Sequence, residues 1–289
     1  MALVSTTLVM LAALCWGLSG GIGAILMNEG WGAYMVSFYR GLIGLLCMLV
    51  WLALRPHGNG LTIRRLWFWS AVAGLGIAGN FAFYFLSIAK GSVAVAATLM
   101  YCAPVFVYLI SFAFKLEKAT RTKWIAIAVV IIGIVLLTRV YDIDTGSITL
   151  LGVGAGLLAG LSYAIFIFGF KYATPHGSPQ AILAIAFAVP VCILIWPANI
   201  HQAIAVLGTP DWSLFIILGI LGAGLSFVLY VMGLNNTAPV VAAIVAMVEP
   251  VTASLFSVVV LDESLVAPQI LGMGLILVTV TTLSAYQNK

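Results

Sequence analysis

Charged side chains are scarce in this chain. Only 7% of the 289 residues are charged, whereas 64% are hydrophobic. A soluble globular protein has roughly 25% charged and 45–50% apolar residues. The 12 basic and 8 acidic residues are too few to cover a surface that faces water. The composition therefore predicts that the chain is embedded in a lipid bilayer.

The sequence also lacks the patterns of several chemical functions. It has no GxxxxGK[ST] loop, which excludes direct use of ATP by this chain, and no HExxH motif or Ser-His-Asp order. The three histidines, His57, His176 and His201, fall in predicted loops. No basic run with interleaved aromatics indicates nucleic acid. The sequence therefore predicts neither an enzyme nor a cofactor.

The few cysteines lie inside apolar runs and have no metal-ligand spacing, so we interpret them as packing residues. They are Cys15, Cys47, Cys102 and Cys192.

Long apolar runs dominate the chain. Crossing a bilayer core takes roughly 20 apolar residues in a helix. Ten such segments are predicted, over about 6–27, 32–54, 66–88, 92–114, 122–138, 150–171, 179–197, 211–234, 239–261 and 267–286. The first lacks a preceding basic region, so we interpret it as a retained span and not as a cleaved signal.

Positive charge is unevenly distributed between the two ends of these spans. The loops on the N-terminal side hold Arg55, Arg64, Arg65, Lys115, Lys118, Arg121, Lys123, Lys171 and Lys289. The loops on the other side hold only Lys90 and Arg139. Because cytoplasmic loops are enriched in lysine and arginine, both termini are predicted to be cytoplasmic.

The sequence repeats itself weakly at a shift of 146 residues. This shift pairs Phe81 with Phe227, Tyr84 with Tyr230, Ala96-Ala97 with Ala242-Ala243, Pro104 with Pro250, Ser111 with Ser257, and Glu117 with Glu263. Gly17-Leu18-Ser19 and Gly160-Leu161-Ser162 correspond at a slightly different offset. We therefore predict a single membrane domain over 1–289, with one repeat over about 1–140 and a second over about 146–289.

Each repeat contains an odd number of spans, so the second has to enter the membrane from the opposite side. The predicted fold class is an all-α membrane protein of ten transmembrane helices, arranged as two inverted five-helix repeats. Inverted repeats build many secondary transporters, in which two halves exchange shapes around a central site. A duplication that only enlarged the bundle is the alternative.

Several short motifs carry a family resemblance. They are Leu14-Cys15-Trp16-Gly17, Tyr39-Arg40-Gly41, Ala103-Pro104 through Glu117, and Glu249-Pro250-Val251 through Asp262-Glu263. With them the whole chain resembles the drug/metabolite transporter superfamily, in its ten-helix EamA branch. Overall it is similar to bacterial inner-membrane exporters of aromatic amino acids. The resemblance implies a multi-pass protein of the bacterial inner membrane that exports small organic metabolites. The first half has Ala103 where the second has Glu249, so the halves are not chemically equivalent.

Two charged residues, Arg40 and Glu249, lie well inside predicted spans. Ionisable groups within a bilayer cost roughly 2.5–3.5 kcal/mol on insertion scales, so they usually have a partner or a function. Arg40 lies about 13 Å from the outer end of its span and Glu249 about 16 Å from the inner end of its own, so their depths nearly coincide. We expect them to be neighbours or a pair. Three roles stay open: a structural ion pair, a substrate carboxylate bound by Arg40, or a coupling proton carried by Glu249.

Pro104 and Pro250 lie near the centres of equivalent spans. Proline removes a backbone hydrogen bond and kinks a helix. Matched breaks at mid-membrane depth are typical of transporter binding sites, and a passive kink that improves packing is the alternative.

Several aromatic and small polar residues lie within the predicted central spans. The predicted substrate-binding residues are Trp16, Ser19, Asn80, Tyr84, Tyr101, Tyr163, Ser226 and Tyr230. Asn80 and Tyr84 are four residues apart and share a helix face, as do Ser226 and Tyr230. We interpret these two faces as an outer and an inner gate. Buried tyrosines that only bond to neighbouring backbone are the alternative.

A cavity with this lining suits a small amphipathic organic molecule. An amino acid, including an aromatic one, is the first candidate. An amphipathic cation is the second, because cations bind over aromatic faces. An intramembrane enzyme and a structural bundle are alternatives of another class. The predicted partners are a small-molecule substrate and the lipid bilayer, with no nucleic acid, no metal and no required protein partner.

Overall fold

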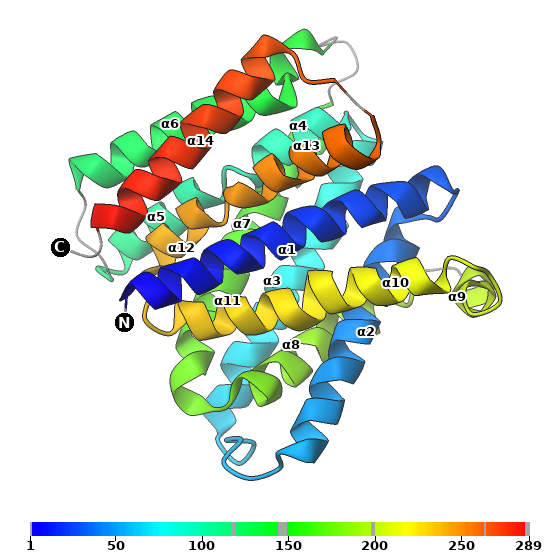
Figure 1. The fold of residues 1–289 in the computed structure, drawn as a ribbon. Coiled ribbons are helices and arrows are strands. Elements are labelled where there is room, and N and C mark those ends of the chain that lie inside the picture. Colours follow the sequence, from blue (N-terminus) through cyan, green and yellow to red (C-terminus); the bar gives the residue numbers. More distant parts are fainter. Residues whose placement is uncertain (1, 117–119, 144–148, 198–199, 263, 287–289) are drawn as a thin grey trace.

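The computed structural model describes residues 2–116, 120–143, 149–197, 200–262 and 264–286, and every regular element in these ranges is a helix (Figure 1). The first half contains α1 (Ala2–Asn28), α2 (Ala33–Leu54), α3 (Arg64–Ala89), α4 (Val93–Met100), α5 (Ala103–Ala113), α6 (Arg121–Thr138) and η1 (Val140–Asp142). The second half contains α7 (Leu150–Ala173), η3 (Thr174–His176), α8 (Pro179–Leu194), α9 (Ile200–Val206), α10 (Trp212–Gly219), η4 (Ile220–Leu225), α11 (Ser226–Leu234), α12 (Pro239–Val245), α13 (Val248–Val260) and α14 (Ala267–Tyr286). The repeat-paired residues Glu117 and Glu263 lie outside the described ranges.

Among the described residues, 8 helical segments are long and apolar enough to cross a bilayer. The pairs α4–α5 and α12–α13 each form one such segment, and so does the continuous run from α10 through η4 to α11. Two further apolar helices, Pro179–Leu194 and Ala267–Leu283, are shorter. At about 1.5 Å per residue, the 16 residues of α8 span only about 24 Å, less than a core of about 30 Å. The chain is thus an all-helical, multi-pass membrane protein in its described residues.

Two central spans are separated into two helices each. α4 ends at Met100 and α5 begins at Ala103, while α12 ends at Val245 and α13 begins at Val248. Pro104 and Pro250 lie in the first turn of the second helix of each pair. A proline ring has no N–H and clashes with the carbonyl four residues earlier, so the backbone cannot continue as one straight helix. The two breaks bring Tyr101 and Glu249 into the middle of the bundle.

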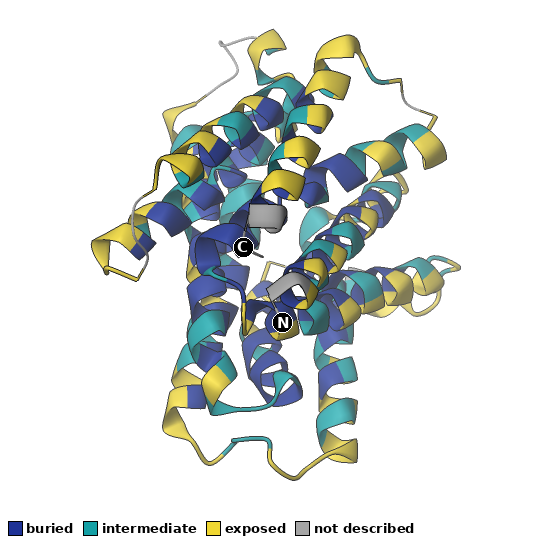
Figure 2. Cartoon of the chain, turned by 60° about the vertical axis from the view of Figure 1, so that its left-hand side comes forward, coloured by how far each residue is buried: buried dark blue, intermediate teal, exposed yellow. Residues whose placement is uncertain are grey.

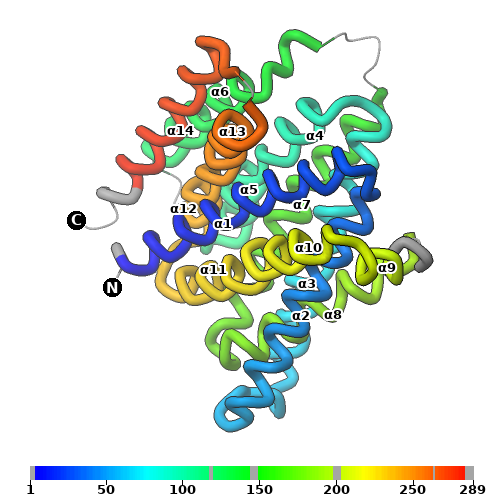
Figure 3. The backbone as a smooth tube through the Cα atoms, turned by 45° about the vertical axis from the view of Figure 1, so that its right-hand side comes forward, coloured from blue at the N-terminus to red at the C-terminus, as the bar shows by residue number. Residues whose placement is uncertain are grey.

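The contacts of the first half recur in the second half with the roles exchanged. α1 packs on α10, α11 and α13, whereas α7 packs on α3, α4 and α5. α2 packs against α8, and α6 against α14, and in each case the 146-residue shift converts one helix into the other. Figures 1 and 3 show α6 and α14 side by side at one edge of the bundle, with α2 and α8 at the opposite edge. This is the arrangement that two halves related by a twofold axis produce.

Buried and exposed faces alternate around the spanning helices (Figure 2). Small residues allow close packing inside: a Cβ on Gly133 would lie 2.9 Å from the carbonyl oxygen of Gly272, so α6 and α14 touch through glycines. The outward faces carry large apolar side chains, such as Leu46, Ile132 and Val278, which are more than half exposed. Contiguous apolar surface of this kind is unfavourable in water and stable against lipid.

One helix between α8 and α10 was not predicted. We expected a loop there, but Ile200–Val206 forms α9, so His201 lies in a helix. His176 likewise lies in the short helix η3. A helix of 7 residues is too short to show a periodic pattern of apolar residues in the sequence.

Candidate functional site

A cavity of about 340 Å³ lies inside the bundle between α1, α2, α3, α7 and α13. At one end its wall includes Met27, Ala33 and Val93, which lie at the end of α1, the start of α2 and the start of α4. Met27 is 43% exposed and Val93 is 60% exposed. The cavity therefore reaches the surface at the end of the bundle opposite to the first turn of α1.

Arg40 enters the cavity from α2 and is held by the backbone of η4. Its Nε donates a hydrogen bond to the carbonyl oxygen of Gly222 at 3.0 Å. Its guanidinium carbon lies 5.6 Å above the ring centroid of Phe81, which is a cation–π distance. A Cβ on Gly222 would lie 2.6 Å from Arg40 Nε and 2.6 Å from Ser19 Oγ, so glycine is required for this approach. The π-helical turn that contains Gly222 is a type of helix defect that recurs at functional sites.

Glu249 enters the same cavity from the break between α12 and α13. It lies in the first turn of α13, where the helix dipole favours a negative charge. Its backbone N–H donates to the carbonyl oxygen of Ala246 at 2.9 Å, which closes the tight turn at the break. The hydroxyl of Tyr101, from the matching break between α4 and α5, lies beside the Glu249 carboxylate. The two helix breaks thus place a carboxylate and a phenol together at the cavity wall.

Arg40 and Glu249 face one cavity but do not close on each other. Each is within electrostatic reach of the other, and both contribute to the cavity wall. The direct ion pair found among the described residues is a different one, between exposed Arg139 and Asp142. Both side chains are partly buried, and neither has an oppositely charged group in direct contact, so the space between them suits a ligand that carries charge.

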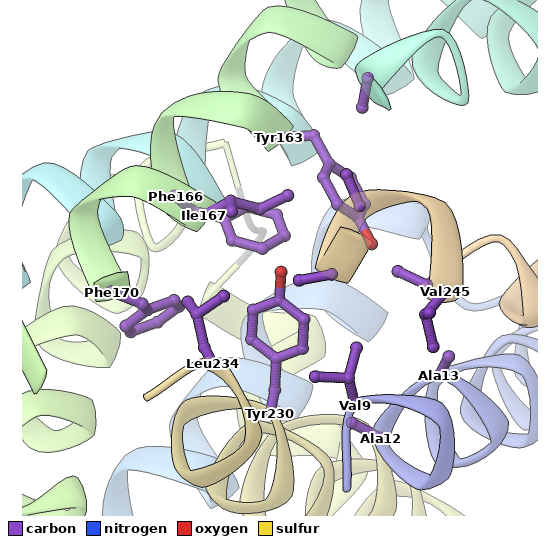
Figure 4. Close-up of a cluster of buried hydrophobic side chains, with 14 of the residues drawn as sticks. Val9, Ala12, Ala13, Tyr163, Phe166, Ile167, Phe170, Tyr230, Leu234 and Val245 are labelled. Carbon is purple, nitrogen blue, oxygen red and sulfur yellow. The ribbon is translucent and has the colours of Figure 1, made fainter. Parts of the chain in front are cut away.

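The other end of the cavity is closed by packed aromatic rings. We name as the aromatic plug the residues Phe166, Phe170, Phe187, Phe227 and Tyr230. Each is at most 4% exposed. Trp16 packs on the cavity side of the plug, with its ring centroid 5.0 Å from that of Phe227 and 4.9 Å from that of Tyr230. Figure 4 shows the Tyr230 side of the plug against Val9, Ala12 and Ala13 in the first half of α1.

The structure brings together most of the residues that we predicted to bind substrate. Six of the eight line the cavity: Trp16, Ser19, Asn80, Tyr84, Tyr101 and Tyr163. Ser226 and Tyr230 do not line it, and both lie fully buried in α11 beside or within the plug. Some of the lining groups are engaged by backbone: Asn80 Nδ2 donates to the carbonyl oxygen of Ala159 at 3.0 Å, and Ser19 Oγ to that of Trp16 at 2.9 Å.

Several cavity residues were missed in the sequence. Phe81, Phe85 and Phe227 line the cavity although their phenylalanine side chains do not stand out in an apolar chain. The repeat carried a usable signal, because the 146-residue shift pairs Phe81 with Phe227. No sequence signal indicated the role of Gly222, since its contacts depend on how α1, α2 and η4 pack.

Within the described part of the chain, no group of three His, Cys, Asp or Glu side chains converges in a way that would hold a metal ion. The cavity instead combines one cation, one anion and aromatic walls.

Family comparison identifies the chain. The sequence pattern of the EamA-like transporter family matches it twice, over residues 4–139 and 150–285. The chain belongs to the EamA-like transporter family. This confirms the resemblance to the drug/metabolite transporter superfamily that the short motifs indicated.

Individual relatives agree with this assignment. YwfM, an uncharacterized transporter of Bacillus subtilis (strain 168), is 26% identical over 289 residues and is covered to 94%, with 97% of this chain matched. An uncharacterized transporter of Archaeoglobus fulgidus is 29% identical over 270 residues, with 90% of each chain covered. A solved crystal structure shares the fold, with a TM-score of 0.79 at 17% identity over 99% of this chain and 98% of its own. The family and these relatives are transporters, so this chain is a membrane transporter of small molecules and not an enzyme.

Proposed function

We propose that this EamA-like protein is a secondary transporter that exports small organic metabolites by alternating access, with amino acids, including aromatic ones, as the preferred substrates. In this proposal ten helices form two inverted five-helix repeats, over about 1–140 and 146–289. Both termini are in the cytoplasm of a bacterium, and the chain lies in the inner membrane. With the N-terminus in the cytoplasm, the cavity mouth at the far end of α1 faces outward and the aromatic plug lies toward the cytoplasm.

The packing of the helices supports alternating access. The cavity reaches the surface at one end, while the plug closes the other. Because the two halves make the same contacts with roles exchanged, an exchange of their shapes would open the plug and close the mouth. In the proposed cycle Tyr84, which lines the cavity near its mouth, belongs to the outer gate and Tyr230 to the inner gate.

The observation that carries the substrate proposal is that two opposite charges, Arg40 and Glu249, face one cavity without forming a direct ion pair. An amino acid has a carboxylate for Arg40 and an ammonium group for Glu249, separated by one carbon atom. Such a zwitterion would give each of these partly buried charges an oppositely charged partner. The volume of about 340 Å³ lies at the lower end of the usual range for ligand pockets, and the aromatic wall suits an aromatic side chain.

An amphipathic cation is the second candidate substrate. Glu249 and the aromatic side chains of the cavity offer a carboxylate and ring faces to a cation. Arg40 opposes this reading because its positive charge lies in the same cavity.

Counterflow in proteoliposomes tests the proposal. Labelled tyrosine would be compared with tyramine, which lacks the carboxylate, and with 3-(4-hydroxyphenyl)propionate, which lacks the ammonium group. The variant Arg40→Gln removes the cavity cation, and Arg64→Gln is the matched control because Arg64 is exposed at the start of α3.

We expect saturable exchange of tyrosine, little exchange of either analogue, and loss of exchange in Arg40→Gln but not in Arg64→Gln. Exchange of tyramine in preference to tyrosine would support the cation reading. Equal exchange of tyrosine by the wild-type protein and a folded Arg40→Gln variant would contradict the assigned role of Arg40.

A further inference from the structure

Unpaired polar atoms are concentrated beside the aromatic plug. Seven buried side-chain N and O atoms of the described residues have no hydrogen-bond partner within the protein, and four of them are Trp16 Nε1, Tyr163 OH, Ser226 Oγ and Tyr230 OH. Leaving a buried donor or acceptor unpaired costs free energy, so most buried polar groups in native proteins are paired. Buried Tyr108 illustrates the usual case, because its hydroxyl accepts a hydrogen bond from the Thr120 backbone N–H at 2.9 Å. The unpaired groups therefore need an explanation.

Three of these atoms belong to aromatic side chains that form a path from the cavity into the plug. Trp16 and Tyr163 line the cavity, and Tyr230 lies directly beyond them. Figure 4 shows the hydroxyl groups of Tyr163 and Tyr230 pointing toward a common space from opposite sides. Tyr163 is also within electrostatic reach of both Glu249 and Tyr230. The three side chains are at most 4% exposed.

The chemistry of these groups indicates what they would bind. An indole N–H is a donor only, and each phenol can donate one hydrogen bond. Apolar side chains, including Val9, Ala13, Phe166 and Val245, lie around the two hydroxyls in Figure 4. Together the three groups can donate three hydrogen bonds to one ligand, and a carboxylate, with two oxygen atoms, can accept all three.

We propose that Trp16, Tyr163 and Tyr230 form a second carboxylate-binding site, which the substrate occupies as it passes the plug. This inference rests on the proposed transport of amino acids. The carboxylate is bound by Arg40 in the open cavity and by the three donors during passage through the plug. In the present conformation the plug is closed, and none of the three groups has a hydrogen-bond partner within the protein.

Phenylalanine substitutions test this site because they keep the rings and remove only oxygen atoms. The variants are Tyr230→Phe and Tyr163→Phe, with Tyr172→Phe as the matched control. Tyr172 also lies on α7, but its ring packs on Trp69 and Phe168, outside the cavity and the plug. The measurements are tyrosine counterflow, its half-saturating concentration, and thermal unfolding of the purified protein without substrate.

In Tyr230→Phe we expect the maximal exchange rate to fall by about tenfold or more, which corresponds to the loss of one hydrogen bond to a carboxylate. The half-saturating concentration should stay within about twofold, because Tyr230 does not line the open cavity. The melting temperature should not fall, since the removed hydroxyl has no partner. Tyr163→Phe should slow exchange in the same way, and Tyr172→Phe should behave as wild type.

Exchange at the wild-type rate in both Tyr230→Phe and Tyr163→Phe would overturn the second site and leave the transport proposal intact. A parallel loss in Tyr172→Phe, or a lower melting temperature with proportionate loss of activity, would also overturn it in favour of a packing role. Absence of amino-acid exchange by the folded wild-type protein would refute the proposed function itself.

Discussion

A methyl group added at Gly222 should displace the Arg40 side chain while leaving its charge unchanged, and should thereby weaken substrate binding. The Cβ of Gly222→Ala would lie 2.6 Å from Arg40 Nε, 2.6 Å from Ser19 Oγ and 2.8 Å from Ser19 Cβ. Non-bonded atoms of this kind are most stable at about 3.5 Å or more. Since Ser19 Cβ is attached directly to the backbone of α1, rotation of side chains cannot relieve the whole clash, and the guanidinium has to move by about 1 Å.

The size of the effect follows from the hydrogen bond that this shift breaks. The distance from Arg40 Nε to the Gly222 carbonyl oxygen is 3.0 Å, and a shift of about 1 Å takes it to about 4 Å, beyond hydrogen-bond range. A hydrogen bond to a charged group contributes about 1.5–3 kcal/mol. This corresponds to a loss of about 10- to 150-fold in affinity if substrate binding depends on the present position of Arg40.

Substrate affinity, measured as half-saturation of tyrosine counterflow, checks this prediction. The matched control is Gly154→Ala, because a Cβ at Gly154 on α7 would meet no atom within 4 Å. Unchanged affinity and rate in folded Gly222→Ala would refute the reasoning, since it would mean that the anchoring of Arg40 by η4 is irrelevant to binding.

Two further substitutions test the packing of the bundle. Lys171→Ala should lower thermal stability, because Lys171 Nζ donates to three backbone carbonyl oxygens at and after the end of α11, at 2.8–3.0 Å. Each such hydrogen bond contributes about 1.5–3 kcal/mol before solvent screening. Lys90→Ala, at an exposed position, is the control. Gly272→Leu should separate α6 from α14 and lower the melting temperature, because its Cβ would lie 2.5 Å from the Gly133 carbonyl oxygen. Gly274→Leu, which has open space around its Cβ, is the control and should fold normally. If either test variant unfolded at the melting temperature of the wild-type protein, the corresponding contact would not contribute to stability as predicted.

The spanning helices were predictable because apolar run length is a local property of the chain. The run expected over 66–88 forms α3 at Arg64–Ala89, and the run over 122–138 forms α6 at Arg121–Thr138. The prolines indicated that two central spans deviate from straight helices, and the structure separates each into two helices. The helix α9 escaped prediction because its 7 residues are too few for periodicity.

The site was partly predictable because ionisable and polar residues are conspicuous in an apolar chain. Arg40, Glu249 and Tyr101 stand out in the sequence for this reason, and all three line the cavity. Phe81 and Phe227 line it too, but phenylalanine does not stand out in an apolar chain, and only their pairing by the 146-residue shift distinguishes them. Tyr230 was assigned to substrate binding with the others, whereas the structure places it in the plug beyond the cavity wall.

By itself the sequence determined that this is a membrane protein, that it is helical, and which residues need partners within a bilayer. These follow from composition and run length, since lipid cannot satisfy backbone or charge. The tertiary structure alone decided which partners are found. Arg40 meets the carbonyl of Gly222 and not the carboxylate of Glu249, and the hydroxyl of Tyr230 meets no partner. The reason is that these contacts join helices far apart in sequence, so their geometry depends on helix packing that no local pattern encodes.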